Sequence, residues 1–452
     1  MSDESVSTGG RLGAVRLARV SEVNGIHVAA ALLACAGVGA TAWGGLHEPA
    51  IALAFGVLIT IGEVARRPCA PGEREPAPLG AAGALAYALL GDCGGRMTTH
   101  SVFQVVTVVL VATLLGSLPH ASRGAGPVLD HLAGRVLIAA FTALCFQPVY
   151  HGVPPVNWTE GALYALFLLV LLVLTALADS VLAAAIQRSR TGYPYGALLR
   201  EELRALPGIG SAVGATGAVM ALAVTVAGLW ALPVFCLPLL LTQLSLRRYA
   251  AVKATYRQTI ASLARATEIA GYTPHGHARR VADLSTAVGR ELGLSGPDLT
   301  VLEYAALMHD IGQLSLVDPV PEGATALLSA AEQRRIALLG GAVVRQSGVP
   351  AAVAVVVERQ ADPYREQPLT ARIVRTVNAY DDLTGGTGNH SGTGQAARAL
   401  EALERLRLAT GHDHQPEVVE SLARVLARDG AKGRGPSDRS CGPRRSDPRR
   451  PG

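Results

Sequence analysis

The chain has 452 residues and a net charge of +5; 50% of its residues are hydrophobic and 17% are charged. Because soluble domains carry about 25% charged residues, this composition excludes a wholly soluble protein, and it also excludes disorder throughout. The average combines two different halves. Residues 1–245 hold 26 of the 75 charged residues, and residues 246–452 hold the other 49. The sequence therefore predicts a membrane half followed by a soluble half.

Long apolar runs fill the first half. They lie at 26–46, 49–65, 79–91, 101–119, 134–151 and 161–187. The stretch 205–246 contains no charged residue. Since a spanning helix needs about 20 apolar residues, this stretch predicts two spans joined near Trp230–Pro233. We expect a membrane domain at 26–246 with about eight transmembrane helices. Seven is the alternative, because 79–91 is short and rich in Gly and Ala.

Arginine residues gather in every second loop between these runs, whereas the alternate loops contain one Arg between them. The positive-inside rule assigns the basic loops to the cytoplasm. All three Trp, at 43, 158 and 230, fall on the Arg-poor side, as an interfacial aromatic belt would place them. We therefore expect a multi-pass protein of the bacterial cytoplasmic membrane, with the N-terminal segment 1–25 and the C-terminus both cytoplasmic. The lipid bilayer is the first expected partner.

The positive charge does not indicate a nucleic-acid partner, because no basic stripe with interleaved aromatic residues occurs. Asp179 is an acidic residue deep in an apolar run and is a candidate functional residue for that reason. It could equally lie near the cytoplasmic interface, since its run is longer than the bilayer needs. We expect the membrane half to anchor the protein or to sense a signal. Asp179 is the single feature of the sequence that would indicate a transporter.

The second half has helical periodicity and no alternating run of strand length, which predicts an all-α fold. Apolar residues continue at helical spacing through a connecting helix at 247–270. The next helical stretches are expected at about 277–292, 298–310, 329–346, 350–361, 368–383, 393–409 and 415–427. The tail at 428–452 is rich in Arg, Gly and Pro and is expected to be disordered.

Three clusters in this half carry metal-binding chemistry. His277 begins one helix, the pair His309-Asp310 ends another, and Asn378 and Asp381 follow much later. Imidazole and carboxylate together suit a divalent metal such as Mn, Fe or Zn, which would activate water and polarise a phosphoryl oxygen. By spacing alone, however, a His-Asp pair is also typical of a surface pair or a helix cap.

Residues 254–427 resemble the HD superfamily of metal-dependent phosphohydrolases, and most closely its HD-GYP group, which cleaves cyclic di-GMP. The motifs that carry the resemblance are, in order, His277-Ala278-Arg279-Arg280-Val281, Ala306-Leu307-Met308-His309-Asp310-Ile311-Gly312, Ala371-Arg372-Ile373-Val374 with Ala379-Tyr380-Asp381-Asp382-Leu383-Thr384, and Gly411-His412-Asp413-His414-Gln415-Pro416. The resemblance implies a cytoplasmic all-helical domain at 271–427. It also implies that His277, His309 and Asp310 are metal ligands, with His309 and Asp310 catalytic.

The sequence departs from this family at several positions. The Lys that follows His-Asp-Ile-Gly in the family and meets the substrate phosphate is Gln313 here. A mid-domain His ligand falls near Ala337, and the His-His-Glu motif aligns with Val356-Val357-Glu358. The late Asp ligand falls on Asn378, with Asp381 one turn further along. The ligands that remain leave room for one divalent metal, held by His277, His309, Asp310 and either Asn378 or Asp381; a site without metal is the alternative.

Two functions remain open at this point. The first is a membrane-anchored, HD-GYP-like signalling protein related to phosphohydrolases that act on cyclic di-GMP or another nucleotide, with a degenerate site. The alternative is a non-catalytic inner-membrane sensor or scaffold whose HD domain binds a partner or a nucleotide. The connecting helix would suit a homodimer. His412 and His414 are expected to lie in a solvated loop.

Overall fold

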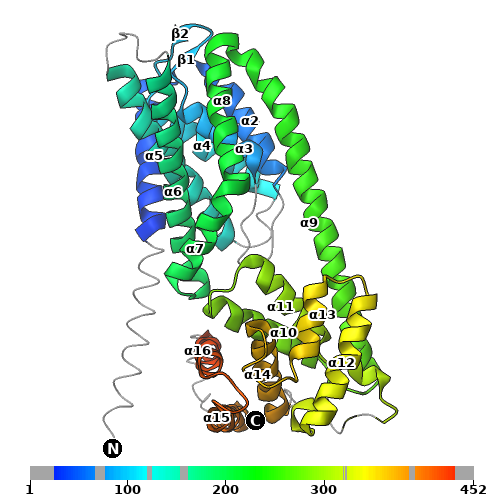
Figure 1. Cartoon of the computed structure of the whole chain (residues 1–452). Coiled ribbons are helices and arrows are strands. Elements are labelled where there is room, and N and C mark those ends of the chain that lie inside the picture. The colour runs from blue at the N-terminus through cyan, green and yellow to red at the C-terminus, as the bar shows by residue number, and fades with distance from the viewer. Residues whose placement is uncertain are drawn as a thin grey trace, which may run out of the picture. The chain divides into compact units, whose positions relative to one another are not determined.

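The structure, a computed structural model, describes residues 25–66, 77–119, 125–152, 161–318, 320, 323–385 and 392–432. Some predictions fall outside the described residues. They concern residues 1–24 of the N-terminal segment, Trp158, much of the basic loops and the tail after Lys432. The chain divides into two compact units, Met1–Lys253 and Ala254–Gly452. Both units are built of helices (Figure 1).

The first unit is a helical bundle with one small hairpin. Its elements are the helix Gly25–Gly44, α2 (Pro49–Val64), α3 (Pro78–Ala88), β1 (Asp92–Cys93), β2 (Arg96–Met97), α4 (Val102–Ser117), α5 (Ala125–Gly152), α6 (Ala162–Thr191), α7 (Tyr195–Ala205), η2 (Leu206–Gly210), α8 (Ser211–Ala227), η3 (Gly228–Trp230) and the first part of α9 (Ala231–Ile269). The two-residue strands pair antiparallel, with Asp92 opposite Met97. Helix α7 falls in a segment for which the sequence predicted only a basic loop.

Among the residues that the structure describes, four helical stretches are long and apolar enough to cross a membrane. They are Gly25–Gly44, Val128–Gly152, Ala162–Thr191 and Ser211–Ile269, the last of which contains α8, η3 and α9. The prediction of membrane helices is thereby confirmed. Helices α2 and α4 are apolar but have 16 residues each, and α3 has 11, fewer than the ~20 residues that a span needs.

Helix α3 is buried along nearly its whole length and packs against α2, α5 and α8. A break between α8 and α9 was predicted near Trp230–Pro233, and the structure has one immediately before, at Gly228–Trp230. Gly228 has a φ of 64°, in the left-handed region that glycine adopts without steric cost. The chain can therefore end α8 and turn at this point.

The interior of the first unit contains a buried acid that the sequence analysis did not single out. Glu63, at the end of α2, is fully buried and lies 2.8 Å from His131 Nε2 on α5. Arg135, one turn further along α5, donates to the same carboxylate at 3.2 Å, and Arg66 Nε lies 3.6 Å away. Asp179, in contrast, is only half-buried. The charged cluster around Glu63 therefore joins α2 to α5.

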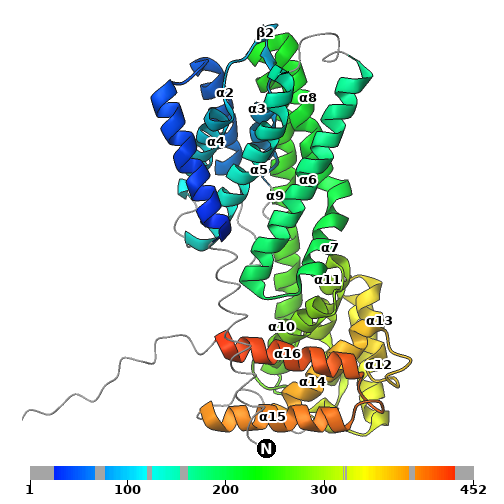
Figure 2. The same ribbon diagram turned by 90° about the vertical axis from the view of Figure 1, so that its left-hand side faces the viewer.

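The second unit begins within α9 and is helical throughout its described part. Its elements are α10 (His277–Glu291), α11 (Gly296–Met308), η4 (Ile311–Ser315), η6 (Thr325–Leu327), α12 (Ala330–Gln346), α13 (Ala351–Arg359), α14 (Leu369–Thr384), α15 (Gly392–Leu408) and α16 (Pro416–Lys432). These confirm the seven predicted helices, and α9 confirms that the last apolar segment continues into the connecting helix. Helices α15 and α16 lie side by side (Figure 2).

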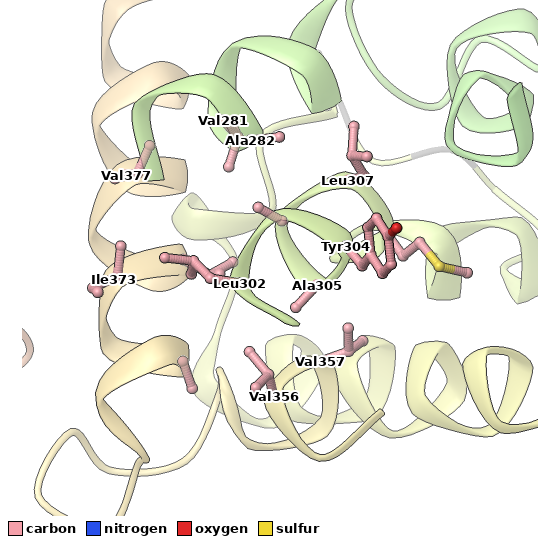
Figure 3. Packing of buried hydrophobic residues seen from close by; sticks show 14 of the residues in the cluster. Val281, Ala282, Leu302, Tyr304, Ala305, Leu307, Val356, Val357, Ile373 and Val377 are labelled. Atoms are coloured by element: carbon pink, nitrogen blue, oxygen red, sulfur yellow. The ribbon is translucent and has the colours of Figure 1, made fainter. Parts of the chain in front are cut away.

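Helix α11 forms the centre of the second unit, where it packs against α10, α13 and α14. Leu302 lies near Ile373 of α14, while Val356 and Val357 of α13 lie below Ala305 (Figure 3). A helix that is apolar on all sides is stable only when it is covered all round. This burial places the C-terminal end of α11, and the residues that follow it, deep inside the unit.

Candidate metal centre

His277 is the first residue of α10 and belongs to its buried face. The buried residues of this helix recur every three or four positions, for example Val281, Ser285 and Val288, which is the spacing of one helical face. Gly276 precedes the helix with a φ of 74°, a conformation that favours glycine. His277 therefore points into the unit, and it is 1% exposed.

His309 and Asp310 follow α11 at the turn into η4, and both are buried. The turn is held against α12 by close packing. A Cβ at Gly312 would lie 2.0 Å from the carbonyl oxygen of Ile336, so only glycine fits there without displacing η4. The Gly of the His-Asp-Ile-Gly motif therefore has a structural reason, which is to fix the turn that carries both polar residues.

The side chains of His277, His309 and Asp310 converge on one point. His277 Nε2 lies 3.3 Å from His309 Nε2 and 3.4 Å from Asp310 Oδ2, and His309 Nε2 lies 3.3 Å from the same oxygen. Among the residues that the structure describes, these three are the His, Cys, Asp and Glu side chains grouped closely enough to hold a metal ion.

The opposite ring nitrogen of each histidine already has a partner. His277 Nδ1 lies 2.8 Å from Asp381 Oδ2, and His309 Nδ1 lies 2.8 Å from the Ala306 carbonyl oxygen. Since a carboxylate and a carbonyl only accept, both Nδ1 atoms donate, and in the neutral imidazoles both Nε2 atoms are acceptors. In that state three acceptor atoms face one another, an arrangement that either a bound cation or a proton on an imidazole stabilises. Metal-binding histidines typically make the same outer hydrogen bond.

The separations within the cluster also fit a transition metal. Bonds of ~2.0–2.1 Å in tetrahedral geometry place two ligand atoms about 3.3–3.4 Å apart. Two imidazoles and one carboxylate form a ligand set that suits Mn, Fe or Zn. The predicted group of His277, His309 and Asp310 is therefore one that could bind a divalent metal.

Protons compete with a metal for this cluster. Burial alone would lower the pKa of His277, but the carboxylates of Asp310 and Asp381 outweigh it and raise the pKa to about 10. Burial also tends to lower the pKa of His309, but the adjacent Asp310 carboxylate raises this pKa overall. Burial would raise the pKa of Asp310, yet the two imidazoles hold it well below its usual range. Metal binding must therefore displace protons from the imidazoles.

Asp381 lies on the far side of the His277 ring from the converging atoms. Its carboxylate accepts two hydrogen bonds from Arg280, one from Nε at 2.9 Å and one from Nη2 at 2.8 Å. It also contacts His277 Nδ1. This geometry makes Asp381 a partner that orients a ligand. The role of Arg280 was missed, although its position one turn after His277 on the same helix was a signal for it.

Asn378 reaches the cluster through Thr325. Its Nδ2 donates to Thr325 Oγ1 at 3.1 Å, and that hydroxyl donates to Asp310 Oδ1 at 3.2 Å. Within the described part of the chain, Asn378 Oδ1 is buried without a hydrogen-bond partner, and so is Asp310 Oδ2. Asp382, which the sequence analysis did not select, has its pKa raised to about 6, mainly by burial and also by Asp310.

The positions at which the HD-GYP resemblance would place further ligands are apolar and buried. Ala337, Val356 and Val357 are each no more than 3% exposed, and the two valines belong to the core cluster around α11. Gln313, which the HD-GYP resemblance would align with a Lys, is completely buried, and among the described residues its Oε1 has no hydrogen-bond partner.

A cavity of about 340 Å³ adjoins the cluster. Its lining includes Asp310, Thr325, Asn378, Arg375 and His414. The expectation of a solvated loop is therefore wrong for His414, which is 7% exposed because it packs against Thr376 of α14, with Nδ1 3.2 Å from the hydroxyl. It holds for His412, whose side chain is 90% exposed.

Comparison with known families identifies this part of the chain. Residues 275–382 match the family described as the HD domain, and this segment contains His277, His309, Asp310, Asn378 and Asp381. The chain matches no curated protein and no solved structure. The helical segment 275–382 therefore matches an HD domain and holds a buried His/Asp group suited to a metal, and long apolar helices precede it in the chain.

Proposed function

We propose that this chain is a membrane-anchored signalling protein whose HD domain holds one divalent metal and acts on the phosphate of a nucleotide. The metal ligands are His277, His309 and Asp310, and the amide oxygen of Asn378 completes the shell. The observation that carries this proposal is the convergence of two Nε2 atoms and one carboxylate oxygen within 3.4 Å of one another.

A bound divalent cation supplies polarisation of a phosphoryl oxygen and activation of water. The chain's own residues prepare the site for it. Asp381, clamped by Arg280, orients His277, and the Ala306 carbonyl orients His309. Thr325 holds the Oδ1 atom of Asp310, which leaves Oδ2 directed at the two imidazoles.

The domain is a degenerate relative of the HD-GYP group. The burial of Ala337, Val356 and Val357 in apolar surroundings supports the degeneracy, because a second metal would need polar ligands at those positions. A site with one metal and a neutral Asn ligand stabilises less negative charge in the transition state than the group's own site. Cyclic di-GMP or another nucleotide is the proposed substrate, turned over slowly.

The second candidate function is a sensor or scaffold that binds a nucleotide or a partner without turnover. The buried, uncharged Gln313 favours it, since a phosphate in the family meets a Lys at that position. In both cases the apolar helices anchor the domain. Eight apolar segments, three of them in helices shorter than a standard span, would place both termini in the cytoplasm. The exposed Tyr249 and Val252 on α9 support a homodimer.

Hydrolysis by the full-length protein in detergent separates the two functions. With Mn²⁺ supplied, cyclic di-GMP and simple nucleotide phosphodiesters should be cleaved by the wild type and not by Asp310→Ala. Turnover that persists unchanged in Asp310→Ala would contradict the enzymatic proposal. Nucleotide binding without any turnover would favour the sensor.

A further inference from the structure

The cavity beside the metal centre contains an arginine that no motif of the sequence analysis selected. In the described part of the chain, Arg375 is the one Arg or Lys in its lining, which also includes Asp310. Arg375 precedes Asn378 by three residues on α14, so the two side chains share one face of that helix. The cavity therefore lies between a cationic side chain and the proposed metal ligands.

The guanidinium of Arg375 is only partly used by the protein. It donates from Nη1 to the Asp362 carbonyl oxygen at 2.8 Å, and its Nη2 lies 3.7 Å from Asp413 Oδ1. The Asp413 side chain is 47% exposed, so the long ion pair contributes little. A guanidinium carries five N–H donors in a planar fork, which leaves donors available for a phosphate.

Among the described residues, no other side chain of the lining offers a positive charge to a phosphate. Burial, together with nearby Arg375, lowers the pKa of His414 to about 4, so His414 is neutral at pH 7. Gln313 replaces the family's cationic Lys. The amides of Gln333 and Gln360 and the apolar side chains of Leu328 and Ile336 also line the cavity. These groups suit the polar edges and the faces of a base, and the volume lies near the lower end of the ~300–1,000 Å³ range of small-molecule sites.

We propose that Arg375 is the phosphate-binding residue of this cavity, and that the ligand is a phosphorylated nucleotide whose phosphate lies between Arg375 and the metal centre. Arg375 thus supplies, from α14, the positive charge that is lost at Gln313. The proposal rests on the proposed function for the metal side of the site, whereas the contact with Arg375 can be tested separately.

The test is binding of inorganic phosphate, GMP and guanosine to full-length protein in detergent, measured calorimetrically after metal loading. Arg375→Gln should bind phosphate and GMP about ten- to hundredfold more weakly than the wild type, since it loses charged hydrogen bonds. Guanosine should bind weakly to both proteins. Arg375→Lys should retain part of the affinity, and Arg405→Gln, which changes an exposed arginine of α15, should bind like the wild type.

Metal content and thermal unfolding are recorded for every variant, so that a misfolded variant is recognised. If Arg375→Gln misfolds, Arg375→Lys is compared with the wild type instead. Equal GMP affinity in the wild type, Arg375→Gln and Arg375→Lys would overturn the proposal, as would guanosine binding to the wild type as tightly as GMP. If the wild type takes up no metal but phosphate binding still depends on Arg375, the proposed function fails and this inference stands. If the wild type binds metal but Arg375→Gln binds phosphate as tightly as the wild type, this inference fails and the proposed function stands.

Discussion

The imidazole of His277 is held from two sides, by the converging ligand atoms on one side and by Asp381 on the other. Such an outer carboxylate fixes the ring and makes it a stronger ligand. We predict that Asp381→Asn weakens Mn²⁺ affinity by ~10–100-fold, measured by competition with a metal indicator. Asp283→Asn is the control, because its exposed carboxylate lies on α10, the helix of His277, and pairs with Arg279. Equal affinity of Asp381→Asn and the wild type would refute this role.

The raised pKa of His277 predicts opposite pH dependences for the metal-free and metal-bound forms. In the metal-free protein, the protonated His277 contributes stability that is present below its ordinary pKa of 6.5 and is lost as pH rises to about 10. Metal affinity rises over the same range because fewer protons must be displaced. The increase in Tm on adding Mn²⁺ should therefore be larger at pH 8.5 than at pH 6.5. A constant or smaller increase would contradict the assignment of His277 as a ligand.

At the scale of elements, the turn between α11 and η4 determines where Asp310 points. Gly312→Ala places a methyl group against the Ile336 carbonyl and must push η4 away from α12. We expect it to cost about 1–3 kcal/mol of stability, as overpacking does, and to reduce metal content. Gly134→Ala, in the interior of α5 with open space around it, is the control. A metal content unchanged in Gly312→Ala would show that the turn does not position the site.

The link between α2 and α5 depends on Glu63. Glu63→Ala leaves the partly buried Arg135 and His131 without their carboxylate, and breaking a buried charge pair costs about 3–5 kcal/mol. The measurement is the thermal unfolding of the detergent-purified protein. Asp179→Ala, at a half-buried acid of α6, should cost less. A larger loss for Asp179→Ala would reverse our ranking of the two acids.

Local periodicity predicted the helices well, because each amphipathic or apolar run carries its own signal. It could not predict the charged cluster of the first unit, since Glu63 and His131 are 68 residues apart and meet only in the folded chain. The site divides in the same way. His277, His309 and Asp310 were identified through the family resemblance, whereas Thr325, Arg280 and the burial of His414 depend on tertiary packing.

At the scale of the whole molecule, the positive-inside rule makes a prediction about orientation. With both termini in the cytoplasm, a fluorescent protein fused after Lys432 should fluoresce, and alkaline phosphatase inserted after Gly95 should be active. An active phosphatase fusion after Lys432 would place the HD domain outside the cytoplasm and away from intracellular nucleotides.

We predict that His277, His309 and Asp310 hold a divalent metal in the intact protein. Elemental analysis of the full-length chain, purified in detergent without chelators and supplied with Mn, Fe or Zn, tests it most directly. We expect about one transition-metal ion per chain, its loss in His309→Ala, and its retention in His412→Ala, which changes an exposed histidine. A folded wild-type protein that takes up no metal, or a His309→Ala variant that keeps it, would show that these residues are not metal ligands.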